Sequence, residues 1–272
     1  MDHAGQSLAG VLGARFYMRE QHQEGMFQKM LRDSAIVSVF DGSSIVCLDS
    51  LATQLPALAR GRERALEVDW SELYDLRASL PELNLQKLDL FGRGRDAVPS
   101  SLPHLLRMLD GVEPTTECPT DRLTRLRAAA RAVSQRLALL DAAAIADPPQ
   151  RGKRLPPQQF ALAESYCGLH AAIACLGVWL HNRDHLGSFF AEGTWLLATL
   201  ERSGGAHFET GSLDAETREA LTSRLLDQYH DHQLFSLLSL RLAEPGQIEG
   251  SSPSENWKAR SADISPFTGA DA

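Results

Sequence analysis

The sequence predicts an all-α protein, and three observations carry that prediction. Apolar residues recur at alternating spacings of three and four along several long stretches, which is the period of a helix. Stop signals separate these stretches, such as Asp147-Pro148-Pro149 and Ser203-Gly204-Gly205. No segment of comparable strength alternates apolar and polar residues as a half-buried β-strand does. We therefore expect helices joined by short connections.

The composition excludes several classes of protein. The chain has 272 residues, of which 43% are hydrophobic and 23% charged, so it is neither collagen-like nor fibrous nor wholly disordered. A formal net charge of −8 offers no electrostatic attraction to phosphates, so we expect no nucleic-acid partner. Four cysteines are too few for a disulfide scaffold and fit a reducing compartment.

The sequence gives no sign of secretion or membrane insertion. No basic segment followed by an apolar one opens the chain after Met1. The longest uninterrupted apolar run, from Ala171 to Leu180, is half of the roughly 20 residues that a membrane-spanning helix needs. We therefore expect a soluble, cytoplasmic protein without a membrane span.

Shifts in composition divide the chain into four parts. Residues 1–60 are helical in pattern, and residues 61–118 form an irregular connector with short helices, broken by prolines and glycines. Residues 119–243 carry the strongest helical periodicity. Residues 244–272 are rich in Ser, Gly, Pro and charge, so we expect a disordered tail.

The third part predicts an up-and-down bundle of four helices. The first helix begins near Thr120 or Asp121, either of which can cap it, and ends before Pro148. Its apolar seam consists of Leu123, Leu126, Ala130, Val133, Leu137, Leu140 and Ala144. The second helix continues the same alternation through Leu162, Tyr166, Leu169, Ile173, Leu176 and Leu180.

Two further helices complete the predicted bundle. The third carries Phe189, Phe190, Trp195, Leu196 and Leu200 and ends at Ser203. The fourth begins near Asp214 and runs through Leu221, Leu225, Tyr229, Leu234, Leu238 and Leu242.

The most informative stretch for function runs from Phe27 to Ser44. Judged by its chemistry alone, the segment Asp41-Gly42-Ser43-Ser44 is a helix start: Asp41 or a serine caps it, and Gly42 permits the turn. The next helix then covers Ile45 to Leu58.

The same stretch resembles the acyl-CoA dehydrogenase family. In that family an Arg-Asp pair is followed, eight residues after the Asp, by a catalytic carboxylate in a Tyr-Glu-Gly-Thr sequence. Here Arg32-Asp33 is followed at that distance by Asp41 in Phe40-Asp41-Gly42-Ser43. Upstream, Leu12 to Tyr17 is similar to the glycine-rich turn of the family. The larger, oxidase-like members append a second helical bundle, which residues 119–243 resemble.

The resemblance implies a fold, a reaction and a set of site residues. Residues 1–60 would be the last helices of the family's C-terminal domain. Asp41 would remove the α-proton of an acyl-CoA or acyl-carrier thioester while FAD accepts the β-hydride. Gly42, Ser43 and Ser44 would lie near substrate and flavin, and Gly13 at a turn that touches the cofactor of a neighbouring subunit.

The resemblance covers only the C-terminal helical part of such a flavoprotein. We therefore expect this chain to need a partner chain that supplies the flavin-binding N-terminal and β-domains, in a homo- or hetero-oligomer. The alternative is a non-catalytic helical interaction or oligomerisation module derived from that family. It is motivated by Asp41, one methylene shorter than the family's glutamate, and by Ala14 and Phe16, which replace two glycines.

Three other motifs favour structural roles. His181 and His185 are spaced like metal ligands on a helix, with His230 and His232 as further ligands only if the fold brings them near. Cys167 and His170 lie one helical turn apart, in apolar surroundings that indicate inert core residues. The segment from Gly92 to Arg95 is interpreted as a surface turn, because no strand precedes it and no Lys-Ser/Thr pair follows.

Overall fold

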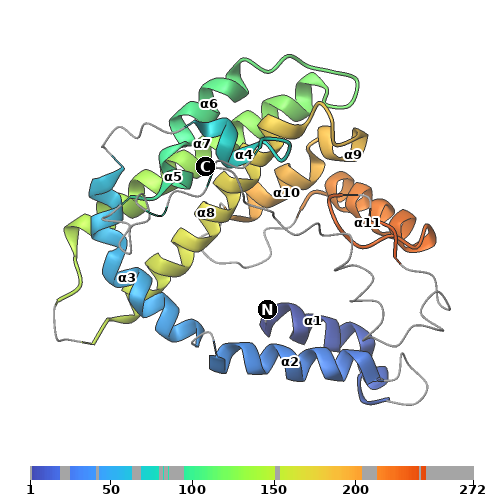
Figure 1. Cartoon of the computed structure of the whole chain (residues 1–272), viewed down its shortest axis with the longest axis horizontal. Helices are drawn as coiled ribbons and strands as arrows, with labels where there is room; N and C mark the ends of the chain where they lie inside the picture. The colour runs from blue at the N-terminus through green and yellow to red at the C-terminus, as the bar shows by residue number, and fades with distance from the viewer. Residues whose placement is uncertain are drawn as a thin grey trace, which may run out of the picture. The chain divides into compact units, whose positions relative to one another are not determined.

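The computed structural model describes residues 2–18, 25–40, 43–62, 69–79, 82, 85, 95–150, 154–203, 213–238 and 240–242. The chain forms two compact units, Met1–Thr217 and Arg218–Ala272, and each is considered by itself. Every regular element in the described part is a helix, and the one β-bridge there is isolated (Figure 1). The all-α prediction is confirmed. The predicted disordered tail, 244–272, lies outside the described residues.

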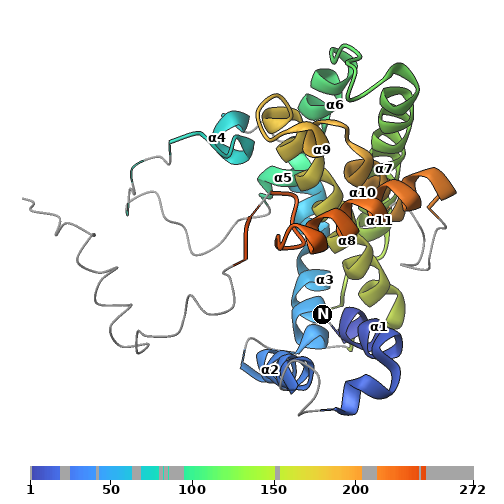
Figure 2. The same cartoon turned by 90° about the vertical axis from the view of Figure 1, so that its right-hand side faces the viewer.

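The core of the first unit is built on two long helices, α7 (Thr120–Ala146) and α8 (Pro157–Asn182). Two further helices, α3 (Ser44–Gly61) and α10 (Thr194–Ser203), each pack against both of them (Figures 1 and 2). The core therefore unites helices from both sides of residue 60.

The predicted seams lie in this core. All seven apolar residues of the α7 seam, from Leu123 to Ala144, are buried. On α8 the seam residues from Tyr166 to Leu180 are buried too, while Leu162 at its start is half-buried. Neither Thr120 nor Asp121 caps α7, however: the N-cap residue is Pro119, and no side chain accepts a hydrogen bond there. The helix ends at Ala146, as the Asp-Pro-Pro sequence predicts.

Short helices cover one side of α8. They are α4 (Trp70–Tyr74), α5 (Ala97–Ser100) and α6 (Leu102–Asp110), and all three contact α8. The Tyr74 ring lies where Gly177 leaves space on α8, since a Cβ at that glycine would come within 2.5 Å of the ring. Asn182 at the end of α8 donates to the Tyr74 carbonyl (2.8 Å) and accepts from the Leu76 amide (2.9 Å).

The third predicted helix is interrupted. It consists of α9 (Ser188–Ala191) and α10, separated by Gly193, whose φ of +72° is unfavourable for residues with a side chain. The residues that carry its apolar pattern are buried as expected, apart from the half-buried Phe189.

The fourth predicted helix is wrong in its length and burial. α11 (Ala215–His230) ends twelve residues before Leu242, and Gln233 instead pairs with Arg241 in the isolated β-bridge. His232, with a φ of +51°, turns the chain there. Leu225 and Tyr229 are exposed rather than buried. The helix that packs on α7 and α8 beside α10 is α3, so the core differs from the predicted bundle.

The first unit also contains an N-terminal arm, by which we mean α1 (Asp2–Leu12), the 3₁₀-helix η1 (Gly13–Tyr17), α2 (Met26–Phe40) and residues 44–51 of α3. α1 lies against α2, since a Cβ at Gly5 would come 2.8 Å from the Leu31 side chain. Gln28 donates to the Phe16 carbonyl (2.9 Å), which ties α2 to η1.

By length and composition alone, α8 is the one helix of the described part that qualifies as a membrane span. Its most apolar window of 18 residues has a mean hydropathy of 1.4, and 44% of that window is buried inside the protein. A core helix meets the same criterion, and α8 packs against α3, α7 and α10.

Candidate functional site

The predicted catalytic centre is only partly within the described residues. Asp41 and Gly42 lie outside them. Ser43 is the N-cap of α3, and its hydroxyl accepts a hydrogen bond from the Val46 amide at 3.4 Å. The prediction that Asp41 or a serine caps this helix is thus confirmed for Ser43. Ser44 is the first residue of the helix and is exposed.

Gly13 begins η1 with a φ of +54°, so the turn predicted there requires glycine. Apart from the neighbouring residues and the backbone of the same helix, no atom of the described residues lies within 4 Å of the position that a Cβ would occupy. Within the described part, no hydrogen bond joins Gly13 to Ser43 or Ser44.

His181 and His185 do not share a helical face, contrary to the prediction, because α8 ends at Asn182 and His185 lies in the turn that follows it. His181 is engaged through Nδ1 with the Gly177 carbonyl at 2.9 Å, and its ring lies 5.5 Å from that of Tyr74. The described residues contain no group of three or more His, Cys, Asp or Glu that could hold a metal ion. His230 and His232 belong to the second unit.

Cys167 and His170 are not core residues, contrary to the prediction. Cys167 is exposed, because it lies on the flank of α8 that faces away from the seam. Nearby protein atoms still desolvate the thiol in part, and this effect, followed by the Glu164 carboxylate, raises the pKa of the thiol, so the thiolate is disfavoured. His170 is half-buried and faces Asp96, with Nε2 3.4 Å from Oδ1.

A polar network, which the sequence did not reveal, joins four helices of the first unit. The Tyr166 hydroxyl donates to Asp96 Oδ2 at 2.6 Å and accepts from Arg62 Nη1 at 3.2 Å. Arg62, the residue after α3, forms a bidentate ion pair with Asp141 of α7, with Nε 2.7 Å from Oδ2. The Asp96 side chain also accepts from the Val98 amide at the start of α5 (3.2 Å).

The network shifts the pKa values of Asp96 and Tyr166. Burial alone raises the pKa of Asp96, but the interactions with His170 and Tyr166 outweigh it and hold that pKa below its ordinary value. Burial, reinforced by the Asp96 carboxylate, raises the pKa of Tyr166 well above its ordinary value. A tyrosine that stays protonated between the Arg62 guanidinium and the Asp96 carboxylate is a structural connection between α3, α5, α7 and α8.

A cleft of about 360 Å³ lies beside the N-terminus of α7. It is lined by Thr115, Glu117, Cys118, Arg183, Asp184, Gly187, Ser188 and Ala191. Arg183 lies over the Trp179 ring (5.4 Å) and 3.5 Å from Asp184. Burial raises the pKa of Cys118 even though Arg122 and Arg183 act against it, so its thiol is not an activated nucleophile.

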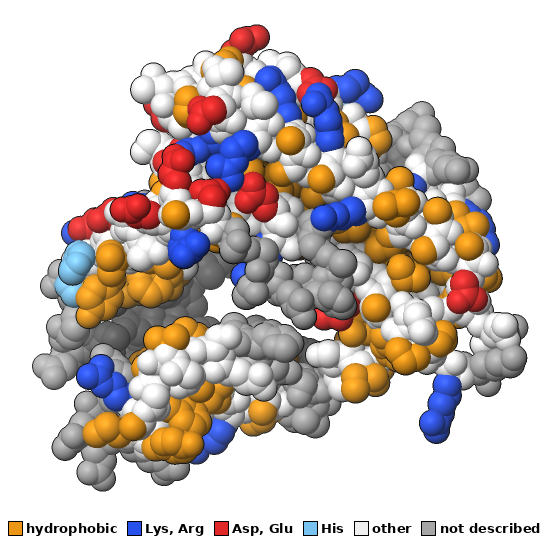
Figure 3. All heavy atoms as spheres, turned by 180° about the vertical axis from the view of Figure 1, so that it is seen from behind, with side chains coloured by type: hydrophobic (Ala, Val, Ile, Leu, Met, Phe, Trp, Pro, Cys, Tyr) orange, Lys and Arg blue, Asp and Glu red, His pale blue; other side chains and the backbone are white. Residues whose placement is uncertain are grey.

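The N-terminal arm carries apolar surface to which no role is assigned. Its large apolar side chains are open to solvent (Figure 3). They are Leu8, Val11, Tyr17, Met18, Met26, Met30, Ile36, Val37, Ile45 and Val46. Exposed apolar side chains are normal when scattered singly, whereas a contiguous group marks an interaction site.

Comparison of the chain with protein-family models, with curated proteins and with solved structures gave no match. None of these comparisons supports the resemblance to acyl-CoA dehydrogenases, which stays an expectation from the motif residues between Leu12 and Ser44.

Proposed function

We propose that this chain works by assembly, with its N-terminal arm docked on another polypeptide. The observation that carries the proposal is the set of exposed apolar side chains on the arm. Val11 is 84% exposed, and Ile45 and Val46 are 68% and 61% exposed. Side chains of this kind are stabilised when another surface removes them from water, by about 25 cal/mol per Å² of apolar area buried.

The two faces of α2 differ in how far the rest of the arm covers them. Phe27, Leu31 and Ser34 lie on one stripe of the helix and are half-buried toward the rest of the arm. Met26, Met30 and Val37 lie on a second stripe, and all three are exposed. α2 thus has one face that the chain covers and another on which Met26, Met30 and Val37 stay exposed around Asp33, which pairs with Lys29.

The resemblance indicates what the second polypeptide supplies. In this proposal it carries the flavin-binding domains of an acyl-CoA dehydrogenase-like protein, and the assembled site oxidises an acyl thioester with FAD. Asp41, Gly42, Ser43 and Gly13 of this chain would complete that site. Asp41 would act as the base that removes the α-proton.

A second candidate function is a non-catalytic oligomerisation module, and the position of Ser43 favours it. The Ser43 hydroxyl is occupied as the cap of α3, which gives the Asp-Gly-Ser segment a structural purpose without any cofactor. The exposed face of the arm would then cover the same helices in another copy of this chain.

Co-expression separates the two candidates. The chain is produced together with a chain that carries the flavin-binding domains of the family, and the complex is isolated by gel filtration with its visible spectrum recorded. The flavoprotein candidate predicts that flavin co-elutes and that Asp41→Asn abolishes dehydrogenation while the flavin band remains. The module candidate predicts self-assembly without flavin. Absence of both a complex and flavin retention would rule out the flavoprotein candidate.

A further inference from the structure

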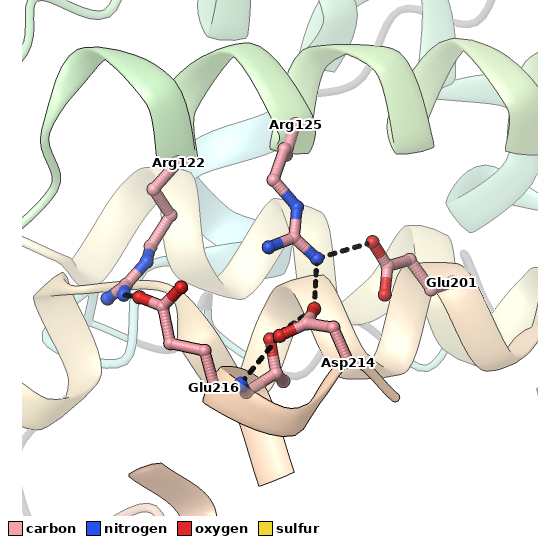
Figure 4. A network of polar contacts seen from close by, with 6 residues as sticks. Arg122, Arg125, Glu201, Asp214 and Glu216 are labelled. Carbon is pink, nitrogen blue, oxygen red and sulfur yellow. Dashed lines mark hydrogen bonds and ion pairs between the residues drawn. The ribbon is translucent and has the colours of Figure 1, made fainter. Parts of the chain in front are cut away.

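A second polar network connects α7 to the start of α11 (Figure 4). Arg125 of α7 points its guanidinium between two carboxylates, with Nη2 3.1 Å from Oε1 of Glu201 and 2.5 Å from Oδ2 of Asp214. Glu201 belongs to α10, and Asp214 immediately precedes α11. A single arginine thus bridges the end of one helix and the beginning of the next.

Asp214 also caps the N-terminus of α11. Its Oδ1 accepts a hydrogen bond from the Thr217 amide (2.8 Å), and its Oδ2 accepts one from the Thr217 hydroxyl (2.9 Å). The carboxylate therefore caps the first turn of α11 while it pairs with Arg125. The Thr217 amide, followed by Arg125, holds the pKa of Asp214 far below its ordinary value, so the carboxylate stays charged.

Arg122, one turn before Arg125 on α7, adds a second connection. Its Nη2 lies 3.8 Å from Oε1 of Glu216, in the first turn of α11, and its Nη1 lies 4.0 Å from Oε2 of Glu192. Two arginines on one face of α7 therefore hold two carboxylates at the beginning of α11, Asp214 and Glu216.

We propose that Arg125 and Arg122 form an ionic clasp that fixes the first turn of α11 on α7 and opens as ionic strength rises. The clasp lies wholly within residues 1–217. α11 itself continues without a break past Thr217, where the second unit begins. The clasp thus fixes the first turn of the helix whose later residues Leu225, Leu226 and Tyr229 have exposed side chains.

Ionic strength controls this clasp because its charges are near solvent. The side chains of Arg125, Asp214 and Glu201 are 40%, 39% and 37% exposed. Interactions between charges at such positions weaken as the screening length falls from about 10 Å at 0.1 M salt to about 3 Å at 1 M. The buried pair of Arg62 and Asp141, with side chains only 9% and 20% exposed, is far less sensitive.

Hydrogen exchange of the full chain tests the clasp. Amide exchange within Ala215–His230 is compared at about 0.05 M and about 1 M salt. The variants are Arg125→Ala, which removes the bridge, and Asp214→Asn, which keeps a capping side chain but loses the charge. Arg131→Ala is the matched control, since Arg131 is another exposed arginine of α7, paired with Asp110 of α6 (2.7 Å) rather than with α11.

The clasp predicts that Arg125→Ala and Asp214→Asn each accelerate exchange in α11 by about 1.5-fold to fivefold at low salt, the range expected for exposed ion pairs. High salt should accelerate exchange in the wild type more than in either variant, because the variants retain only the Arg122–Glu216 connection of the clasp, and Arg131→Ala should match the wild type throughout. The proposal is overturned if salt does not alter exchange in wild-type α11, if Arg125→Ala behaves like Arg131→Ala, or if wild-type α11 already exchanges as an unfolded segment at low salt.

Discussion

Leu176→Ala should destabilise the protein severely, because Leu176 is only 1% exposed within the core that α8 forms. Truncation of a buried leucine to alanine removes the transfer free energy of the deleted atoms and leaves a cavity, which together cost about 2–5 kcal/mol. For a chain of this size, each kcal/mol lowers the melting temperature by about 2–4 °C, so the expected decrease is about 4–20 °C.

The matched control is Leu139→Ala on α7. Leu139 is 71% exposed although it lies between the buried seam residues Leu137 and Leu140, so its truncation should change stability by no more than about 0.5 kcal/mol. Urea denaturation followed by far-ultraviolet circular dichroism gives both values. A loss below about 1 kcal/mol for Leu176→Ala, or equal losses for the two variants, would mean that the helical faces are wrongly phased.

Three further predictions concern packing and charge in the first unit. Gly177→Ala should cost about 1–3 kcal/mol by overpacking against the Tyr74 ring, while Gly111→Ala, whose Cβ meets only ordinary contacts at 3.5 Å, should cost less in the same urea titration. Tyr166→Phe should cost about 1–3 kcal/mol, because it leaves the partly buried Asp96 carboxylate without its 2.6 Å donor; an unchanged urea midpoint would show that the network contributes nothing. The pKa of Asp96 is lower in the folded protein than in the unfolded chain, so the Asp96 carboxylate stabilises the fold above the unfolded pKa of about 3.9, and this stabilisation is lost as pH falls through the folded pKa. The difference in unfolding free energy between wild type and Asp96→Asn should therefore shrink between about pH 5 and pH 2. A difference that stays constant over that range would contradict the lowered pKa of Asp96.

The sequence predicted best where one local rule decided the outcome. The seam of α7 repeats every three or four residues over the whole helix, and all seven of its members are buried. Ser43 lies directly before a helix-compatible run, and it is the cap. Period and capping depend on neighbours in the chain, so they can be inferred without knowledge of the fold.

The sequence-based predictions were wrong where contacts between residues distant in the sequence decide the structure. The apolar pattern predicts a helix from Asp214 to Leu242, but α11 ends at His230 and the chain turns at His232. Whether Leu225 is buried depends on which other helices pack against it, and the pattern does not give that information. α3 enters the core through Ala52, Leu55 and Ala59, although the sequence assigned it to a separate part.

The Tyr166 network could not be predicted either. Its partners Asp96 and Arg62 lie 70 and 104 residues away in the chain. Tyr166 resembles any other seam residue in the sequence, because an amphipathic ring satisfies the apolar pattern while its hydroxyl reaches a polar partner.

The mass of the protein in solution tests the assembly proposal most directly. Light scattering after gel filtration is applied to the chain alone and to the chain co-expressed with the flavin-binding chain. The wild type should exceed the 29.8 kDa of one chain in at least one preparation, and the double variant Met30→Glu/Val37→Glu should remain at 29.8 kDa in both. Leu139→Glu, which places the same charge on an exposed leucine outside the arm, should behave as the wild type. A wild-type chain that stays at 29.8 kDa in both preparations, or an arm variant that assembles as well as the wild type, would contradict the account.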